Sequence, residues 1–427
     1  MITGNQERII IAVVSLRVCT ITFDWYPFEV RALRMAEAAA DAGYDVDVIC
    51  LCKPGESRYE VINGVHIHRL PVKRVAHTLP LKILYWCWFL LFAGIVVTWY
   101  HLKRPYKVIH VHNMPDFLVF SALFPRLLGA RIVLDIQDVS PELMAAKASG
   151  LKRLIAVRLA TWQEHISTTF AHHVVTTGKP FEDILVKRGI ARVKITRILN
   201  SADTHLFPFA RQCPPPFDVA QDKEKQPFIL MYHGTLCERN GLDIALHALV
   251  LARRVVSQLR LDIQGGGDQL AYLKQLTREL GLSDSVIFTD SVDSEKLVDF
   301  VVHGDVGIIP YRCDGFANLV LPTKAYEFAW MGRPMIASDT FAIRSMFRPE
   351  SIILCDPAQP ESFAEAMIDL YQHPEKRASM IANAAEDYIP YRWELAAESY
   401  QQLLARLSYA PTREEHAQEQ PLISSES

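Results

Sequence analysis

A lysine and a glutamate stand three residues apart in the stretch LVLPTKAYEFAWMGRPMIAS, which spans residues 319–338. Pro322 favours the first turn of a helix, so Lys324 falls near the positive end of that helix, where the dipole disfavours its charge. Glu327 lies on the same helix face. An exposed pair of this kind would contribute only about 0.3–0.5 kcal/mol. The pair is therefore either a surface salt bridge or part of a ligand site in which Lys324 binds phosphate, and the second reading explains the placement better.

Two glycine-containing turns follow predicted strands in the same half of the chain. LRLDIQGGGDQL places Gly266 and its neighbours between a strand and a helix, and YHGTLCERNGLD places Gly234, Thr235 and Arg239 between another strand and helix. Glycine lets the backbone approach a ligand, and a helix N-terminus favours an anion. A guanidinium group can bind two diphosphate oxygens at once. Tight turns and a solvated arginine would give the same pattern, but together the features favour a phosphate or nucleotide site. The pattern is not GxGxxG, so a dinucleotide site is not indicated.

Polar residues also stand at predicted strand ends in the N-terminal half. Asp135 stands near the end of ARIVLDI and Asp138 follows it, and His110 and His112 alternate along one face of VIHVHN. Asp138 is either a cleft residue or the cap of the next helix. We expect His110 in the core and His112, at the strand end, facing a cleft. Asp24, in CTITFDWYPFE after the first predicted strand RIIIAVV, is expected on a loop that either approaches a substrate or is a surface turn.

Apolar β-rich runs alternate with helical patterns along most of the chain, which predicts parallel sheets covered on both faces. A proline-rich and charged stretch near residue 200 interrupts this rhythm, and a second series begins after it. We expect an α/β protein with two doubly wound Rossmann-like domains facing across a cleft, where ligands bind beyond the strand ends. The predicted segments are two domains at 1–200 and 201–388, a helix at 389–408 that could cross back to the first domain, and a disordered tail at 409–427.

Composition excludes some classes of function. Among 427 residues, 50% are hydrophobic and the formal net charge is −3, which does not suggest binding to nucleic acid. The 8 cysteines form no CxxC pair and no metal-ligand spacing, so reduced thiols in a cytoplasmic protein are expected. The polar N-terminus does not read as a signal peptide.

One segment departs from this soluble pattern. The run ILYWCWFLLFAGIVVTWY, residues 83–100, carries no charge and is flanked by Lys82, Lys103 and Arg104. Its aromatic residues gather toward both ends, as interfacial anchors do. Three placements stay open: a helix packed on the protein, a helix docked on the membrane surface, and a true span. The strand pattern continues on both sides as one domain, which disfavours the span.

The order of the motifs resembles glycosyltransferase family 4, which has the GT-B fold, over about residues 8 to 405. The stretches that resemble its donor half are HGTLCERNGLD, GGG, VIFTDSV, DVGIIPY and LPTKAYEFAWMGRP; the front half is similar through IHVHNMPDFLVFSAL, LDIQDVSPELMAAK and ILNSADTHLF. The resemblance implies a nucleotide-diphosphate sugar as donor, no metal and no other cofactor, and transfer with retention of configuration. Glu327 matches a glutamate that binds the ribose hydroxyls. Lys324 and Arg239 match positions that neutralise the diphosphate, and backbone amides from Gly315 to Leu319 would meet the sugar and phosphates.

Three positions depart from the family pattern. Leu319 stands where the first glutamate of an E-x7-E motif is expected, and Arg239 is followed by Asn240 instead of a second basic residue. Gln137 stands where relatives carry a histidine that contacts the donor sugar or assists the acceptor, and glutamine cannot take up a proton. The candidate catalytic residues are thus Asp138, His112 and Gln137, with Asp24 as a candidate for acceptor binding.

We therefore expect a metal-independent glycosyltransferase of the hexosyltransferase class. The apolar helix suggests a lipid-linked or polysaccharide acceptor in bacterial surface glycan synthesis, and a peripheral position on the inner face of the cytoplasmic membrane. The rivals are a nucleotide-sugar epimerase on the same fold and a non-catalytic scaffold. A phosphorylase of the glycogen type would be much longer. An assay with donor alone identifies an epimerase, and a nucleotide-binding assay identifies a scaffold.

Overall fold

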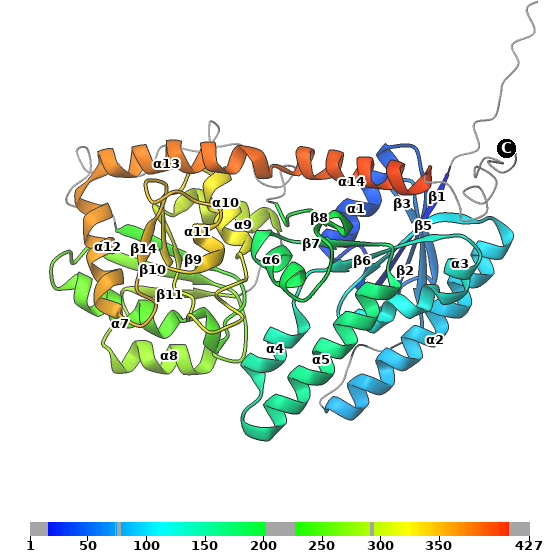
Figure 1. Cartoon of the computed structure of the whole chain (residues 1–427). Coiled ribbons are helices and arrows are strands. Elements are labelled where there is room, and N and C mark those ends of the chain that lie inside the picture. The colour runs from blue at the N-terminus through cyan, green and yellow to red at the C-terminus, as the bar shows by residue number, and fades with distance from the viewer. Residues whose placement is uncertain (1–15, 73, 75–77, 202–226, 291–293, 410–427) are drawn as a thin grey trace, which may run out of the picture. The chain divides into compact units, whose positions relative to one another are not determined.

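The computed structural model describes residues 16–72, 74, 78–201, 227–290 and 294–409 (Figure 1). The chain divides into two compact units. The first comprises residues up to 138, 162–175 and those from 397 onward, and the second comprises 139–161 and 176–396. Three predicted segments lie wholly or mostly outside the described residues. They are the first strand RIIIAVV, the proline-rich and charged stretch after residue 200, and the tail.

An eight-stranded sheet has the order β3-β4-β2-β1-β5-β6-β7-β8. Its strands are β1 (Arg17–Trp25), β2 (Asp45–Leu51), β3 (Tyr59–Ile62), β4 (Val65–Leu70), β5 (Tyr106–His112), β6 (Arg131–Ile136), β7 (His173–Thr176) and β8 (Ile195–Arg197). The helices of this part of the chain are α1 (Val30–Asp41), α2 (Leu79–Lys103), α3 (Leu123–Leu127), α4 (Ser140–Lys147), α5 (Gly150–Phe170) and α6 (Lys179–Lys187), with short 3-10 turns η1 (Asp116–Ala122) and η2 (Arg192–Lys194). Strand β1 pairs in parallel with β2 and β5, and β5 pairs in parallel with β6.

A six-stranded sheet has the order β11-β10-β9-β12-β13-β14, and its paired strands are parallel. Its strands are β9 (Phe228–His233), β10 (Leu259–Gln264), β11 (Val286–Thr289), β12 (Val306–Ile309), β13 (Met335–Ser338) and β14 (Ile353–Cys355). The helices that follow and separate them are α7 (Leu242–Arg253), α8 (Leu270–Glu279), α9 (Ser294–His303), α10 (Thr323–Trp330), α11 (Phe341–Arg344), α12 (Pro360–Gln372), α13 (Pro374–Tyr388) and α14 (Trp393–Ser408), with 3-10 turns η4 (Glu238–Asn240) and η5 (Ile389–Tyr391).

Both faces of this second sheet are covered, as the strand–helix alternation predicts. Along β9, Leu230 and Tyr232 point into a core shared with α7 and α12, whereas the intervening Met231 points into a core shared with α10 and α13. Because side chains alternate between the two faces, a fully apolar strand needs helices on both sides. The carboxyl ends of the strands are then left for loops, where ligands of such sheets bind.

The strand β1 corrects one expectation. Asp24 was expected on a loop after the first strand, but it lies near the end of β1, whose partner on one side is β2. The run RVCTITFDW is rich in β-branched and aromatic residues, which fit a central strand. Asp24 is therefore held at the carboxyl end of a central strand and not on a free loop.

The hairpin of β3 and β4 was not predicted. It pairs antiparallel at the edge of the eight-stranded sheet, next to β2. Its turn is Asn63-Gly64, with φ of 49° and 78°. Asn-Gly between alternating apolar residues is a strong hairpin signal, because both positions need positive φ. The signal was present in the sequence and could have been used.

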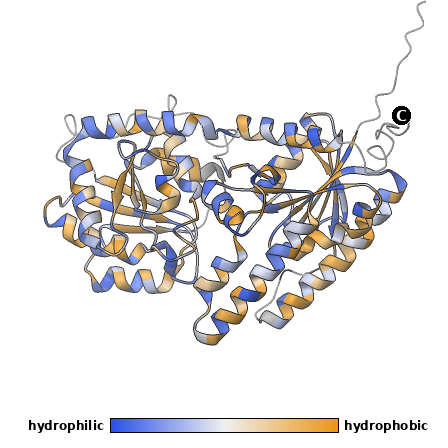
Figure 2. Ribbon diagram, in the orientation of Figure 1, coloured by the Kyte–Doolittle hydropathy of each residue, from blue (hydrophilic) through white to orange (hydrophobic). Residues whose placement is uncertain are grey.

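Helix α2 packs by one stripe of its surface. Phe89, Ala93 and Val97, at intervals of about one turn, are buried, whereas Leu91 and Ile95 on the opposite side are more than half exposed. In the part of the chain that the structure describes, one helix, Pro80–Lys103, is long and apolar enough to cross a membrane, and 17% of its most apolar window is buried. Length and composition alone are weak support for a span. Figure 2 shows the apolar colouring along this helix.

Candidate functional site

A cavity of about 300 Å³ lies at the carboxyl ends of β9 and β10 in the second unit. The two glycine turns singled out in the sequence meet there. The residues that line it are His233, Gly234, Thr235, Gln264, Gly265, Gly266 and Leu297. The predicted donor-binding residues Gly234, Thr235 and Gly266 are thus brought together.

The three consecutive glycines have different roles. A Cβ atom on Gly265, whose φ is +144°, would lie 2.0 Å from the carbonyl oxygen of Gly234, and one on Gly267 would lie 2.1 Å from that of Leu236. These two positions need glycine because the two turns pack backbone against backbone. A Cβ on Gly266 would meet nothing within 4 Å. Gly266 is therefore the member of the three that leaves open space at the cavity.

Lys324 lies inside the protein and not on its surface. It is the second residue of α10 and is 5% exposed. Its Nζ donates a hydrogen bond of 3.1 Å to the Tyr311 hydroxyl and lies 4.5 Å from the centre of the Tyr232 ring. A Cβ on Gly234 would lie 3.5 Å from the same nitrogen. The surface salt-bridge reading is wrong, and the ammonium group is positioned directly behind the first glycine turn.

Lys324 keeps its charge despite its burial. Burial alone would lower the pKa of the ammonium group, but the oxygens of Tyr232 and Tyr311, and then the Glu327 carboxylate, outweigh burial and raise this pKa. A cation held in a dry site interacts strongly with an anion that enters it. The site therefore combines open backbone with one fixed positive charge.

Glu327 is on the same side of α10 as the cavity. Its Oε2 lies 3.1 Å from Nε2 of His233, which lines the cavity. Burial, and then the nearby Lys324, lower the pKa of His233 to about 3, so the imidazole is neutral at pH 7. His233 was not among the predicted site residues, although its position before Gly234 at a strand end was a usable signal.

The remaining predicted donor-binding residues gather around Phe316. The Arg239 guanidinium lies 5.2 Å from the centre of the Phe316 ring. Gly315 precedes that ring and is exposed, and the Leu319 amide donates to the Phe316 carbonyl at 2.9 Å. The Arg312 amide donates to the Arg239 carbonyl at 2.8 Å, which ties this turn to the loop after β12. That loop leads from Tyr311 to Lys324, so both groups of residues are anchored to one segment.

A larger cavity, of about 490 Å³, lies in the first unit. It contains the predicted residues Asp24, Gln137 and Asp138. Its other lining residues are Thr22, Phe23, Glu29, Arg74, Lys82, Tyr85, Trp86, Asn113 and Met114. Asn113 organises the strand end, because its side chain accepts from the Gln137 amide at 2.9 Å and donates to the Asp138 carbonyl at 2.8 Å.

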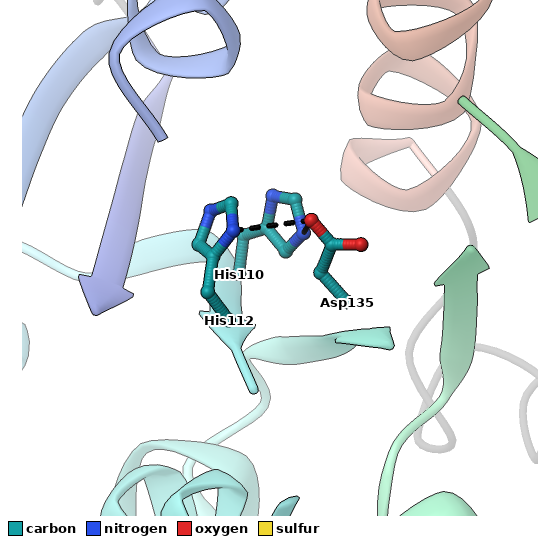
Figure 3. A group of neighbouring side chains, drawn as sticks. All are labelled: His110, His112 and Asp135. Carbon is teal, nitrogen blue, oxygen red and sulfur yellow. Dashed lines mark ion pairs between the residues drawn. The ribbon is translucent and has the colours of Figure 1, made fainter. Parts of the chain in front are cut away.

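The expectation that His112 faces a cleft is wrong, because its side chain is buried and is not among the residues that line this cavity. Its Nδ1 is 3.1 Å from an oxygen of Asp135 (Figure 3). The same nitrogen lies 3.1 Å from Nε2 of Gln137. Arg31 holds the same carboxylate through two nitrogens, at 2.6 and 2.9 Å. Burial alone would raise the pKa of Asp135, but Arg31 and then His112 lower it well below its usual value. His112 therefore contacts Gln137, which lines the cavity, and its own ring is covered.

His110 belongs to the core, as expected. It is fully buried, and its Nδ1 lies 2.9 Å from the Tyr400 hydroxyl of α14. Burial, and then the neighbouring His112, lower its pKa well below the usual value, so it is neutral. Residues of α14 from Ala397 onward belong to the first unit, and this contact is one reason.

His110, His112 and Asp135 lie close enough to be considered as metal ligands, with one ligand atom from each within 4.8 Å of the others (Figure 3). The chemistry of the group argues against a cation. The Arg31 guanidinium already balances the carboxylate charge, and the Tyr400 hydroxyl already contacts His110. An ion entering this buried group would be repelled by Arg31. The contacts fit a structural network better than a metal centre.

The fold is that of GT-B glycosyltransferases. The structure is similar to sucrose-phosphate synthase from Thermosynechococcus elongatus, with a TM-score of 0.72 and 18% identity over 92% of this chain and 100% of that one. It is also similar to HepE from Anabaena, solved in complex with UDP-glucose, with a TM-score of 0.65 and 13% identity over 91% and 99% of the two chains. At these identities the likeness shows the fold alone.

The chain belongs to the glycosyltransferases of family 4 type. Residues 28–201 match the glycosyl transferase 4-like domain, and residues 216–387 match glycosyl transferases group 1. An uncharacterized glycosyltransferase from Methanocaldococcus jannaschii is 24% identical over 90% of this chain and 96% of its own length. A GDP-mannose-dependent phosphatidylinositol monomannoside mannosyltransferase from Mycolicibacterium smegmatis is 29% identical over 34% of this chain and 39% of its own. The family expectation from the motifs is confirmed.

Proposed function

We propose that this glycosyltransferase moves a hexose from a nucleotide-diphosphate sugar to an acceptor hydroxyl, with retention of configuration and without a metal ion. The observation that carries the proposal is the buried, charged Lys324 behind the glycine turns of the 300 Å³ cavity. The oxygens of Tyr232 and Tyr311, and then Glu327, keep this ammonium group charged, and an anion that enters the cavity is attracted strongly because little water screens the charge. A diphosphate in the cavity supplies that anion.

The donor is held by residues of the second unit. Lys324 and Arg239 neutralise the diphosphate, and the backbone amides of Gly234, Thr235 and Gly266 and of the turn from Gly315 to Leu319 bind its oxygens. The Glu327 carboxylate, which lies 3.1 Å from Nε2 of His233, accepts hydrogen bonds from the ribose hydroxyls. The complex of HepE with UDP-glucose supports a nucleotide sugar as the donor. No resident cofactor is required, because the protein cations act where a metal would act.

The chemical step breaks the bond between the anomeric carbon and the diphosphate oxygen. The acceptor oxygen forms a new bond to that carbon on the same face, and its proton passes to the departing diphosphate. Lys324 stabilises the charge that develops on the leaving group. This route needs no protein side chain to accept the proton. Gln137 and Leu319, which cannot accept one, are therefore compatible with it. It is therefore consistent with both departures from the family pattern.

The acceptor is held by the first unit, in the 490 Å³ cavity that Asp24, Gln137 and Asp138 line. Asp138 accepts a hydrogen bond from the acceptor hydroxyl, and Asp24 binds a second hydroxyl. Gln137 contacts the transferred sugar. His112 orients the side-chain amide of Gln137, because its Nδ1 lies 3.1 Å from Nε2 of Gln137.

The acceptor is a lipid-linked or polysaccharide glycan of bacterial surface synthesis, and the enzyme works at the inner face of the cytoplasmic membrane. The apolar exposed side of α2, with Trp99 beside Lys103 at 4.5 Å, supports docking in the interface and not a span. The Mycolicibacterium smegmatis relative is named for a phosphatidylinositol monomannoside acceptor, which is a lipid.

A panel of nucleotide sugars tests the proposal, read by thermal shift and by hydrolysis of the donor. We expect one base to raise the melting temperature, and its sugar to be released slowly in the absence of acceptor. The Lys324→Ala variant should lose both signals. Failure of the wild-type protein to bind any nucleotide would favour a scaffold, and conversion of the donor to an epimer would favour an epimerase.

A further inference from the structure

Helix α2 forms part of the wall of the 490 Å³ cavity. Its first turns contribute Lys82, Tyr85 and Trp86 to the lining. The spacing of Lys82, Trp86 and Phe89 places them on one side of the helix, and Phe89 continues that side into the buried core. Trp86 is fixed edge-on against Phe117 of η1, with ring centres 6.3 Å apart. One helix thus borders the cavity with one side and exposes apolar side chains with the other.

The diameter of a helix sets the distance between the cavity on one side of α2 and a membrane on its other side. A helix is about 10–12 Å across with its side chains, and an interfacial helix buries its apolar face about 5–10 Å into the boundary of headgroups and acyl chains. If α2 docks by its exposed apolar side, the cavity on its other side lies at the level of the lipid head groups. A lipid whose acyl or prenyl chain stays in the bilayer can therefore place its head group in the cavity.

Among the charged side chains of the cavity, one cation can bind an anionic group of a ligand. Arg74 contacts the Asp24 carboxylate, and the Glu29 carboxylate caps α1 by accepting from the amides of Arg31, at 3.3 Å, and Ala32. Lys82 is exposed and forms no ion pair with another residue in the described part of the chain. It stands at the start of α2, where the chain of a docked lipid would meet its head group. A phosphate at the junction of head group and chain is the anion that fits this position.

We propose that the acceptor is a phosphate-linked lipid, whose phosphate or diphosphate binds Lys82 and whose apolar chain follows the first turns of α2 into the bilayer. Trp86 contacts the first carbons of the chain, and the hydroxyl to be glycosylated reaches Asp138 at the other side of the cavity. This inference rests on the proposed transfer function and adds to it the acceptor class and the subsite for its phosphate.

Binding of three soluble probes tests the subsite: farnesyl diphosphate, farnesol and inorganic diphosphate, each measured by calorimetry. The donor cavity also binds diphosphate, so all titrations are repeated in the Lys324→Ala variant. We expect farnesyl diphosphate to bind Lys324→Ala at least tenfold more tightly than either farnesol or inorganic diphosphate. Adding Lys82→Glu to that variant should weaken the binding of farnesyl diphosphate at least tenfold. Adding Lys107→Glu, an equal charge change at an exposed lysine of β5 outside the cavity, should change it less than twofold.

Two results would overturn the inference: farnesyl diphosphate binding that survives Lys82→Glu unchanged, or binding that disappears in Lys324→Ala alone, which would place the probe in the donor cavity. Thermal melting of each variant confirms that it is folded, and Lys82→Gln provides a second, milder substitution. Donor hydrolysis by the wild-type protein is measured separately. Hydrolysis without farnesyl diphosphate binding counts against this inference alone, whereas no nucleotide-sugar turnover at all counts against the proposed function.

Discussion

The ammonium nitrogen of Lys324 lies 3.1 Å from the hydroxyl oxygen of Tyr311, so a residue that the sequence offered as half of a surface pair is a buried cation. Tyr311 lies near the start of the loop that follows β12, and Lys324 is the second residue of α10. Their contact closes the loop between them and fixes the charge behind the first glycine turn. The position of this charge is what links the fold to donor binding.

Replacing Lys324 by alanine should reduce turnover at least ~100-fold, because the leaving diphosphate loses an oriented charge in a site with little water. Steady-state rates at saturating donor, with the cognate nucleotide sugar, measure this loss. Tyr311→Phe is the matched control, since it removes one hydrogen bond and keeps the cation, and it should cost no more than about tenfold. Near-normal turnover of Lys324→Ala would return the residue to a structural role.

Glu327→Ala should also lower turnover at least ~100-fold, for a different reason, because the ribose loses its carboxylate partner. Glu327→Gln keeps the shape and one acceptor, and should recover part of the loss. A comparison of donors with ribose and with 2′-deoxyribose checks the assignment. If Glu327 binds the ribose hydroxyls, the variant should discriminate between the two donors less than the wild-type enzyme does. Equal discrimination by both proteins would contradict the assignment.

Sequence patterns predicted the strands well where periodicity and turn chemistry agreed. DVDVICL and YKVIHVH coincide with β2 and β5, since both are short apolar runs with β-branched residues bounded by polar ones. RVCTITFDW has the same character, yet it was assigned partly to a loop because RIIIAVV before it competed for the role of first strand. Two adjacent β-rich runs cannot be ranked by local pattern alone, since the choice depends on which one finds partners in the sheet.

The candidate site shows a similar division. Gly234 and Gly266 could be singled out because glycine between a strand and a helix lets the backbone approach a ligand. Lys324 could be singled out because a lysine at a helix start goes against the dipole, and such violations often mark function. Arg31 was missed, since an arginine in an amphipathic helix is ordinary and its pairing with Asp135, 104 residues away, depends on the tertiary fold. No spacing in the sequence encodes that contact.

Removing one partner of the buried pair of Arg31 and Asp135 should destabilise the first unit. Arg31→Met leaves the Asp135 carboxylate buried without its cation, which costs about 3–5 kcal/mol and lowers the melting temperature by roughly 6–20 °C. The double variant Arg31→Met with Asp135→Leu removes both charges and should recover much of this loss. Arg58→Met, at an exposed arginine, is the control and should shift melting by about 2 °C or less. A single variant as stable as the control would show that the carboxylate is not dependent on Arg31.

The buried His233 makes stability depend on pH. Its native pKa is about 3, and an unfolded histidine has a pKa of about 6.5. Above pH 6.5 the imidazole is neutral in both states and has no effect. Below pH 6.5 the imidazole binds a proton in the unfolded state and not in the native state. The free energy of unfolding therefore falls by about 1.4 kcal/mol per pH unit until pH approaches 3. Between pH 7 and 5 this residue should therefore cost about 2 kcal/mol.

Urea unfolding of the wild type and of His233→Gln, followed by tryptophan fluorescence, isolates this effect from other histidines. The advantage of the wild type over the variant should shrink by about 2 kcal/mol from pH 7 to pH 5, because glutamine does not titrate. A constant difference between the two proteins at both pH values would mean that His233 takes up its proton equally readily in the native and unfolded states.

Docking of α2 on membranes is open to a direct test with sedimented vesicles. Leu91 and Ile95 lie on the exposed side of the helix, and removing two apolar side chains from the interface should cost at least about 3 kcal/mol, or ~100-fold in vesicle affinity. We expect Leu91→Glu with Ile95→Glu to remain in the supernatant of phosphatidylglycerol vesicles that sediment the wild type. Val193→Glu with Val255→Glu adds the same charge at two exposed valines of the second unit and should leave sedimentation unchanged. If both double variants lose sedimentation equally, the effect is one of net charge. If Leu91→Glu with Ile95→Glu still sediments with the vesicles, α2 does not enter the interface.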